Sequence, residues 1–169
     1  IEEIANMLMV NRRVDYIIER INFYGHDGEK TKALGFCATV KHAKYMAEEF
    51  NKRLSKNNGQ VAVALSGDDS VEVREKYARL LEDDNSPLQY IFSVDIFNEG
   101  IDIPSVNTVL LLRPTDSSII FIQQLGRGLR KLDGKEFVTV LDFIGNYKKS
   151  FLMAIALNGK QDYDRDSLK

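Results

Sequence analysis

The feature that most constrains the fold is a regular alternation of short apolar runs with amphipathic helical patterns. Val14, Ile17 and Ile21 share one face of a helix that we expect to end before Gly25. Further helical stripes are expected over 43–54, 73–81, about 115–130 and 151–156. Short apolar runs between them predict strands over 33–38, 61–65, 88–94, 107–112 and 137–144. This order is typical of an α/β fold with three layers, in which helices cover both faces of a mainly parallel sheet.

The composition fits one ordinary domain. The 169 residues include 44% apolar and 28% charged residues, which is enough to bury a sizeable core. The formal net charge of −2 excludes a globally basic nucleic-acid coat but allows a local basic patch. No apolar run approaches the ~20 residues that a membrane span needs, so we expect no membrane partner.

The single cysteine and the first residue suggest a cellular compartment and a domain organisation. Cys37 is the only cysteine, which leaves no internal disulfide and no cysteine zinc cluster. A reducing, cytoplasmic localisation is therefore expected. The chain opens on Ile1 instead of methionine, and we expect it to be part of a longer protein. Within it, we expect a helical lead-in over 1–24, a main domain over 25–157 and a polar tail over 158–169.

Two glycine-containing segments come close to nucleotide-binding loops but lack required residues. Residues 25–31 fail the phosphate-loop pattern, because lysine stands at position 30 where glycine is required and because they precede the first strand. Residues 126–128 begin a dinucleotide fingerprint that fails at Lys131. We therefore expect that the chain alone does not hydrolyse a nucleotide.

The strongest chemical signal lies between Gln123 and Arg130. At 100° per residue, Gln123, Arg127 and Arg130 share one helical face, opposite an apolar arc that would pack on the sheet. Guanidinium groups stay charged and offer forked donors that suit phosphate oxygens. Taken alone, the pattern is also consistent with an ordinary solvated basic face.

A second signal follows the strand expected over 88–94. Glu99-Gly100-Ile101-Asp102 combines a glycine that allows close backbone approach with a carboxylate that can accept from a hydroxyl. Ligands of parallel sheets bind at the carboxyl ends of strands, where this segment would lie. A helix or turn cap is the alternative interpretation of Asp102.

In their order and spacing, these two segments resemble the C-terminal RecA-like domain of superfamily 2 helicases. Gln123-x-x-Gly126-Arg127-x-x-Arg130 resembles helicase motif VI, and residues 99–102 resemble motif V. The version of these motifs found here is more similar to DNA translocases of the restriction and repair type than to DEAD-box RNA helicases.

Two further segments extend the resemblance to roughly residues 30–145. Phe36-Cys37-Ala38-Thr39, followed by His42-Ala43, is similar to helicase motif IV. Ser66-Gly67-Asp68 is similar to the small element after the next strand. The implied fold is the RecA-like version of the three-layer sheet.

The resemblance implies a role in ATP hydrolysis that this chain would share with an N-terminal RecA-like domain of the same polypeptide. That domain would bring the phosphate loop and hold most of the coordination of Mg²⁺. Arg127 and Arg130 would act as arginine fingers on the γ-phosphate of ATP, and Gln123 would orient the phosphate or couple the two domains. Gly100 and Asp102 would contact the sugar side of the nucleotide.

The resemblance also implies contacts to nucleic acid, to DNA more than to RNA, through amides and hydroxyls at strand ends. The matching positions are Thr39, Lys41, Ser66, Gly67 and Ser93. A small basic patch of Lys41, His42 and Lys44 lies among them, although a charge cluster on a helix is also consistent with a solvated face.

Two other function classes stay open. A non-catalytic module that binds nucleic acid or protein could use the same fold, although it has little need for the paired arginines. A free-standing nucleotide-dependent enzyme is disfavoured by the two incomplete glycine loops. A phosphate loop upstream of Ile1 would distinguish a motor from a module.

Overall fold

The computed structural model describes residues 11–25, 29–56, 59–94, 105–113 and 138–144. The elements are, in chain order, α2 (Asn11–Tyr24), β1 (Ala33–Phe36), α3 (Val40–Leu54), β2 (Ala62–Leu65), α4 (Val71–Glu82), β3 (Tyr90–Ser93), β4 (Thr108–Leu111) and β5 (Thr139–Asp142). All five expected strands are confirmed. The helices expected over 115–130 and 151–156 lie outside the described residues.

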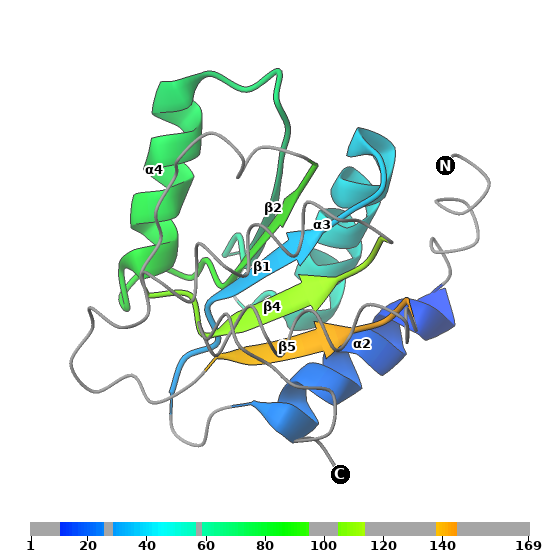
Figure 1. Cartoon of the computed structure of the whole chain (residues 1–169). Helices are drawn as coiled ribbons and strands as arrows, with labels where there is room; N and C mark the ends of the chain where they lie inside the picture. Colours follow the sequence, from blue (N-terminus) through cyan, green and yellow to red (C-terminus); the bar gives the residue numbers. More distant parts are fainter. Residues whose placement is uncertain (1–10, 26–28, 57–58, 95–104, 114–137, 145–169) are drawn as a thin grey trace, which may run out of the picture.

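The strands form one parallel sheet in the order β2-β3-β1-β4-β5 (Figure 1). β1 pairs with both β3 and β4, so that Phe36 is level with Ser93 on one side and with Leu111 on the other. Leu65 of β2 is level with Ser93, and Asp142 of β5 with Leu111. Because no strand is shifted along its neighbour, all the carboxyl ends lie along one edge of the sheet.

Helices cover both faces of this sheet, as expected (Figure 1). Successive side chains of a strand point to opposite faces. Leu34 and Ile91 therefore pack with Leu81 of α4 in one apolar cluster. Phe92 and Leu110 point the other way and pack with α2 and α3 in a second cluster. The predicted three-layer arrangement is confirmed.

The helix at the amino end of the described chain belongs to the second cluster. Val14, Ile17 and Ile21 of α2 are buried and pack with residues of α3 and the sheet. The spacing of these residues predicted this buried face. The domain boundary expected after residue 24 stays a prediction, although α2 packs on the same sheet as the rest of the described chain.

A side chain of α3 binds the backbone at the start of β2, the outermost strand on that side of the described sheet. Asn51 Oδ1 accepts from the N–H groups of Val61 and Ala62, at 2.8 and 2.9 Å. The Asn51 amide nitrogen donates to the Ala62 carbonyl at 2.8 Å. One amide thus pairs three backbone groups at a position where no further described strand is available.

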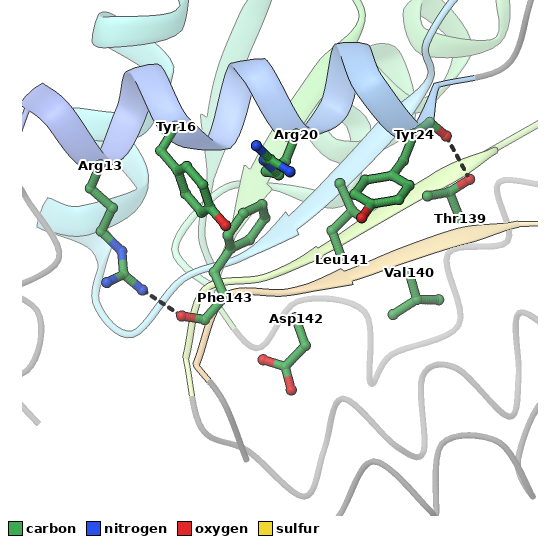
Figure 2. Close-up of a pocket in the computed structure, with 9 residues that line it drawn as sticks. All are labelled: Arg13, Tyr16, Arg20, Tyr24, Thr139, Val140, Leu141, Asp142 and Phe143. Atoms are coloured by element: carbon green, nitrogen blue, oxygen red, sulfur yellow. Dashed lines mark hydrogen bonds between the residues drawn. The ribbon is translucent and has the colours of Figure 1, made fainter. Parts of the chain in front are cut away.

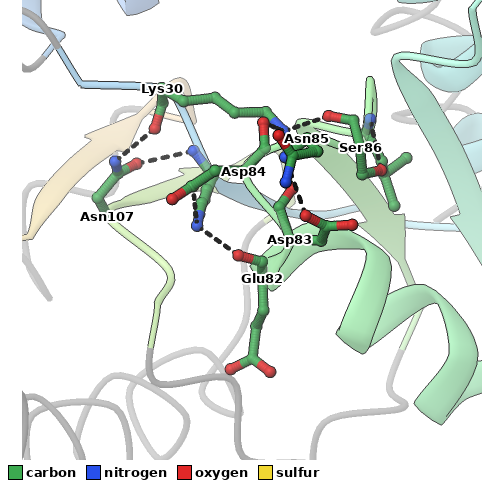
Figure 3. A network of polar contacts seen from close by, with 9 residues as sticks. Lys30, Glu82, Asp83, Asp84, Asn85, Ser86 and Asn107 are labelled. Atoms are coloured by element: carbon green, nitrogen blue, oxygen red, sulfur yellow. Dashed lines mark hydrogen bonds and ion pairs between the residues drawn. The ribbon is translucent and has the colours of Figure 1, made fainter.

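A polar network at the amino ends of the strands joins β1, β4 and the end of α4 (Figure 3). Asn107 accepts from the Lys32 N–H at 2.9 Å and donates to the Lys30 carbonyl at 2.9 Å. Lys32 Nζ donates to the Glu82 carbonyl at 2.7 Å and pairs with the Asp84 carboxylate at 2.7 Å. Lys30 Nζ binds carbonyls of the turn after α4. The two ammonium groups lie where the helix dipole favours cations.

Gly35 in β1 lies against an aromatic cluster. A Cβ at this position would come within 2.5 Å of Phe92 Cδ1, which is closer than real Cβ contacts. The Phe92 ring packs edge-on against Phe50, with centroids 4.8 Å apart, and Phe50 packs against Tyr90 at 4.9 Å. All three rings are buried, so Phe92 cannot move aside without disturbing α3.

Gly35→Ala is expected to lower the free energy of unfolding by about 1–3 kcal/mol, because the added methyl overpacks this cluster. Urea unfolding followed by circular dichroism measures the change. Gly67→Ala is the matched control, since a Cβ there meets no heavy atom within 4 Å. Its effect should stay within about 0.5 kcal/mol. Equal stability of the two variants would contradict the assigned role of Gly35.

Candidate functional site

The carboxyl ends of three adjacent strands carry the residues expected to contact nucleic acid. Ser66 and Gly67 follow β2, Ser93 ends β3, and Thr39 and Lys41 lie at the junction of β1 with α3. Their strands are neighbours in the sheet and end at the same level. The fold therefore brings these sequence-distant residues to one edge. Their contact with nucleic acid stays a prediction.

Thr39 begins α3 as its N-cap. Its hydroxyl oxygen accepts from the His42 N–H at 3.1 Å, and its carbonyl accepts from the Ala43 N–H at 3.0 Å. A hydroxyl that accepts in this way keeps its own hydrogen for donation. Lys41 follows on the exposed side of the first turn. This turn thus offers a hydroxyl and an ammonium group at the end of the central strand.

The loop after β2 is a turn held by Asp69. Its carboxylate accepts from the Ser66 N–H at 2.6 Å and from the Ser66 hydroxyl at 3.3 Å. The Arg74 Nε donates to the Asp69 carbonyl at 3.1 Å, which anchors the turn to α4. Gly67 and Asp68 are exposed at its tip. The hydroxyl of Ser66 is therefore already hydrogen-bonded within the turn, whereas Gly67 is exposed and has open space where a side chain would be.

Ser93 and Cys37 lie inside the protein at the same level. Both are fully buried, and the Cys37 N–H donates to the Ser93 carbonyl at 2.8 Å. Ser93 Oγ has no hydrogen-bond partner among the described residues. Burial raises the pKa of the Cys37 thiol, so the thiolate is disfavoured and the residue behaves as a core thiol. Of the five expected nucleic-acid contacts, Ser93 is thus fully buried, and Ser66 is buried with 8% of its surface exposed.

His42 is not part of a basic patch, contrary to expectation. The side chain is 1% exposed, and its Nδ1 accepts from the Ala38 N–H at 3.3 Å. Burial, with a smaller effect from the charge of Arg13, lowers the pKa of His42 to about 4. The imidazole is therefore neutral at pH 7, and the cations of this turn are Lys41 and Lys44. The sequence did contain a sign of this burial, because His42 is adjacent to the apolar stripe of α3.

The residues expected to act on ATP lie outside the described residues. They are Gly100, Asp102, Gln123, Arg127 and Arg130. Within the described ranges, no group of three or more His, Cys, Asp or Glu side chains lies together in a way that could hold a metal ion. None of the helices in the same ranges is long and apolar enough to span a bilayer.

A pocket of about 600 Å³ between α2 and β5 was not foreseen from the sequence (Figure 2). Its lining comprises Arg13, Tyr16, Arg20, Tyr24 and residues 139–143. Arg13 Nη2 donates to the Phe143 carbonyl at 2.7 Å and links the two walls near the carboxyl end of β5. The regular spacing of arginine and tyrosine along α2 was a visible signal, but its partner strand lies more than 110 residues away in the chain.

Comparisons with family models and with known proteins agree on one family. The model for the helicase conserved C-terminal domain matches residues 12–131. The chain is 31% identical over 112 residues to the putative ATP-dependent helicase IRC3 of Saccharomyces cerevisiae, covering 66% of this chain and 16% of that protein. It is 33% identical over 137 residues to the putative helicase 22 of a Sulfolobus islandicus filamentous virus, covering 81% and 22%. The chain thus spans less than a quarter of the length of either relative.

Solved structures share the fold. A fragment of a putative HsdR subunit of a type I restriction enzyme from Vibrio vulnificus superposes with a TM-score of 0.67 at 19% identity, covering 89% of this chain and 30% of that one. UvsW of phage T4 superposes with a TM-score of 0.60 at 24% identity, covering 83% and 27%. The matched part of this chain therefore has the RecA-like arrangement that the motifs implied.

The depressed pKa of His42 makes stability fall as the pH is lowered. In the unfolded chain a histidine takes up its proton near pH 6.5, whereas folded His42 stays neutral down to about pH 4. Full stability is present above pH 6.5 and is lost progressively between these two values. Between about pH 7 and pH 5 the free energy of unfolding should fall by about 2 kcal/mol.

Urea unfolding at the two pH values measures this loss. His42→Gln removes the titrating group while keeping an acceptor for the Ala38 N–H, and it should flatten the pH dependence in this window. All other side chains are the same in the two proteins, so their contributions cancel in the comparison. The same pH dependence in the variant and the parent would disprove the role of His42.

Proposed function

Because the chain belongs to the helicase conserved C-terminal domain family of superfamily 2, we propose that it is the C-terminal motor domain of an ATP-dependent DNA helicase or translocase. In this proposal the active cleft is shared with an N-terminal RecA-like domain of the same polypeptide. That domain supplies the phosphate loop and most of the Mg²⁺ coordination, while this chain supplies arginine fingers and nucleic-acid contacts.

The observation that carries the proposal is the common edge formed by the ends of β2, β3 and β1. Open backbone at Gly67, a hydroxyl at Thr39 and an ammonium group at Lys41 lie along it. Such groups bind phosphate oxygens without reading base sequence, as a protein that moves along a strand requires. Few cations are needed for this, which is compatible with the net charge of −2.

The catalytic part of the proposal rests on the motif that the family match includes. Gln123, Arg127 and Arg130 fall within the matched residues 12–131. A guanidinium group aimed at the γ-phosphate offsets the charge that develops during transfer, and in related NTPases it is worth ~10³–10⁵ in rate. Gly100 and Asp102, also within the match, are assigned to the sugar side of ATP.

DNA is the favoured nucleic acid in this proposal. Relatives include a type I restriction enzyme endonuclease subunit of Escherichia coli, 28% identical over 117 residues, and the ATP-dependent DNA helicase uvsW of phage T4, 31% identical over 91 residues. A putative ATP-dependent RNA helicase of Methanocaldococcus jannaschii matches over 50 residues, which is 30% of the chain. The longer matches support DNA.

Arg127→Ala and Arg130→Ala, made in the complete two-domain protein, are each expected to abolish ATP hydrolysis stimulated by nucleic acid. Binding of ATP should be largely retained, because the other domain holds most of the nucleotide. Steady-state ATPase assays and nucleotide titrations measure the two effects separately. Arg79→Ala, on the exposed side of α4, is the control and should behave as the parent. Parental turnover in both finger variants would refute their assignment.

The purified 169-residue chain is expected to show no ATPase activity, with or without DNA, because the proposed active cleft requires the N-terminal domain. A coupled phosphate-release assay tests this, and adding the separately purified N-terminal domain should restore turnover. Robust hydrolysis by the chain alone would overturn the shared-cleft model and favour a free-standing enzyme.

A further inference from the structure

The α2–β5 pocket, formed by one face of α2 and by residues 139–143, combines cationic and aromatic side chains in a regular order (Figure 2). Arg13, Tyr16, Arg20 and Tyr24 follow one another at intervals of three or four residues, which places all four on the same side of the helix. At 1.5 Å per residue this row extends over about 16 Å. The pocket is therefore an elongated site with room for several units of a chain-like ligand.

The two tyrosines of the pocket remain accessible, and the ring of Tyr16 is also held in place. Tyr16 and Tyr24 are each 50% exposed. The Tyr16 ring packs edge-on against Phe143, with centroids 6.1 Å apart, and the Arg20 guanidinium lies 5.1 Å from its centroid. A ring that is fixed on one side and open on the other can stack with a planar group at little entropic cost.

The charge on the α2 side of the pocket is positive. Arg13 binds only a backbone carbonyl among its described contacts, and so its charge is not neutralised there. Arg20 pairs with the exposed carboxylate of Glu19 at 3.1 Å, while its Nε is buried without a hydrogen-bond partner. Asp142 is the acidic lining residue, but its side chain points away from α2 (Figure 2) and accepts from the Ile144 N–H at 2.8 Å.

We propose that the α2–β5 pocket is a binding site for single-stranded nucleic acid, in which bases stack on Tyr16 and Tyr24 and phosphates contact Arg13 and Arg20. Alternation of stacking rings with guanidinium groups along a groove suits this ligand, because every base has an aromatic face and every linkage a negative charge. The end of the pocket at Arg13 and Phe143 lies at the same carboxyl edge of the sheet as the proposed interface, with β4 between β5 and β1. The inference rests on the proposed function and adds a second contact surface to it.

Fluorescence anisotropy with a labelled oligothymidylate of about twelve nucleotides tests the site in the purified protein. Tyr16→Ala and Tyr24→Ala should each weaken binding about ten-fold, whereas Tyr16→Phe, which keeps the ring, should bind as the parent does. Arg20→Gln should reduce the slope of log affinity against log salt by about 0.7. Arg79→Gln, an exposed arginine on α4 with a side chain 72% exposed, should leave that slope unchanged.

The possible outcomes separate this inference from the proposed function. Binding that is weakened by Lys41→Ala but not by the three pocket variants overturns the inference and leaves the strand-end interface intact. Unchanged affinity together with a lower urea midpoint in Tyr16→Ala also overturns it and assigns the pocket to protein packing. If the parent protein binds neither single-stranded nor duplex DNA, both the inference and the nucleic-acid part of the proposed function fail.

Discussion

The described structure depends on the pairing of β1 with β3 and β4 in the same register. As a central strand with both faces buried, β1 fixes the level of its two neighbours, and they fix β2 and β5. Parallel pairing also requires each strand to return over a face of the sheet, which places helices on both sides. One backbone constraint therefore produces the three layers and aligns the loops at the carboxyl edge.

The two edges of the sheet use their charges differently. At the amino edge, Lys30 and Lys32 are bound to carbonyls and to a carboxylate at the end of α4, so their charges hold the fold together. At the carboxyl edge, Lys41 is exposed and forms no ion pair with any residue of the described ranges. A near-neutral chain can in this way keep cations available where an anionic ligand would bind.

Much of the fold could be predicted because its signals are local. The strands are short apolar runs, and Val14, Ile17 and Ile21 mark the buried face of α2 by spacing alone. The strand order could not be deduced, since it depends on contacts between distant segments. The same limitation hid the α2–β5 pocket, because Arg13 and Phe143 are 130 residues apart. For the same reason, the sequence predicted Asn107 only as the first residue of a strand. It did not reveal that the Asn107 side chain links the start of β4 to the residues before β1.

The location of the candidate site could be predicted from the sequence, but the burial and hydrogen bonds of its individual side chains could not. The strand-end loops followed from the α/β pattern, and Lys41 and Gly67 are exposed there. The sequence shows that His42 is a residue that can carry a positive charge, and it was therefore counted as a cation. It does not show that the side chain is buried and accepts from the Ala38 N–H. The roles of Gln123, Arg127 and Arg130 rest on family resemblance, because a row of polar side chains on a helix has the same pattern whether it binds phosphate or water.

Asn51 has a consequence for what can add to the outer edge of β2. An outer strand with unpaired backbone groups is a template on which a strand of another domain or molecule can add. By binding the backbone at the start of β2, the Asn51 amide occupies the hydrogen-bonding positions that such a strand would need first. Addition of a strand at this end of β2 is therefore disfavoured, which leaves contacts across this part of the edge to side chains and loops.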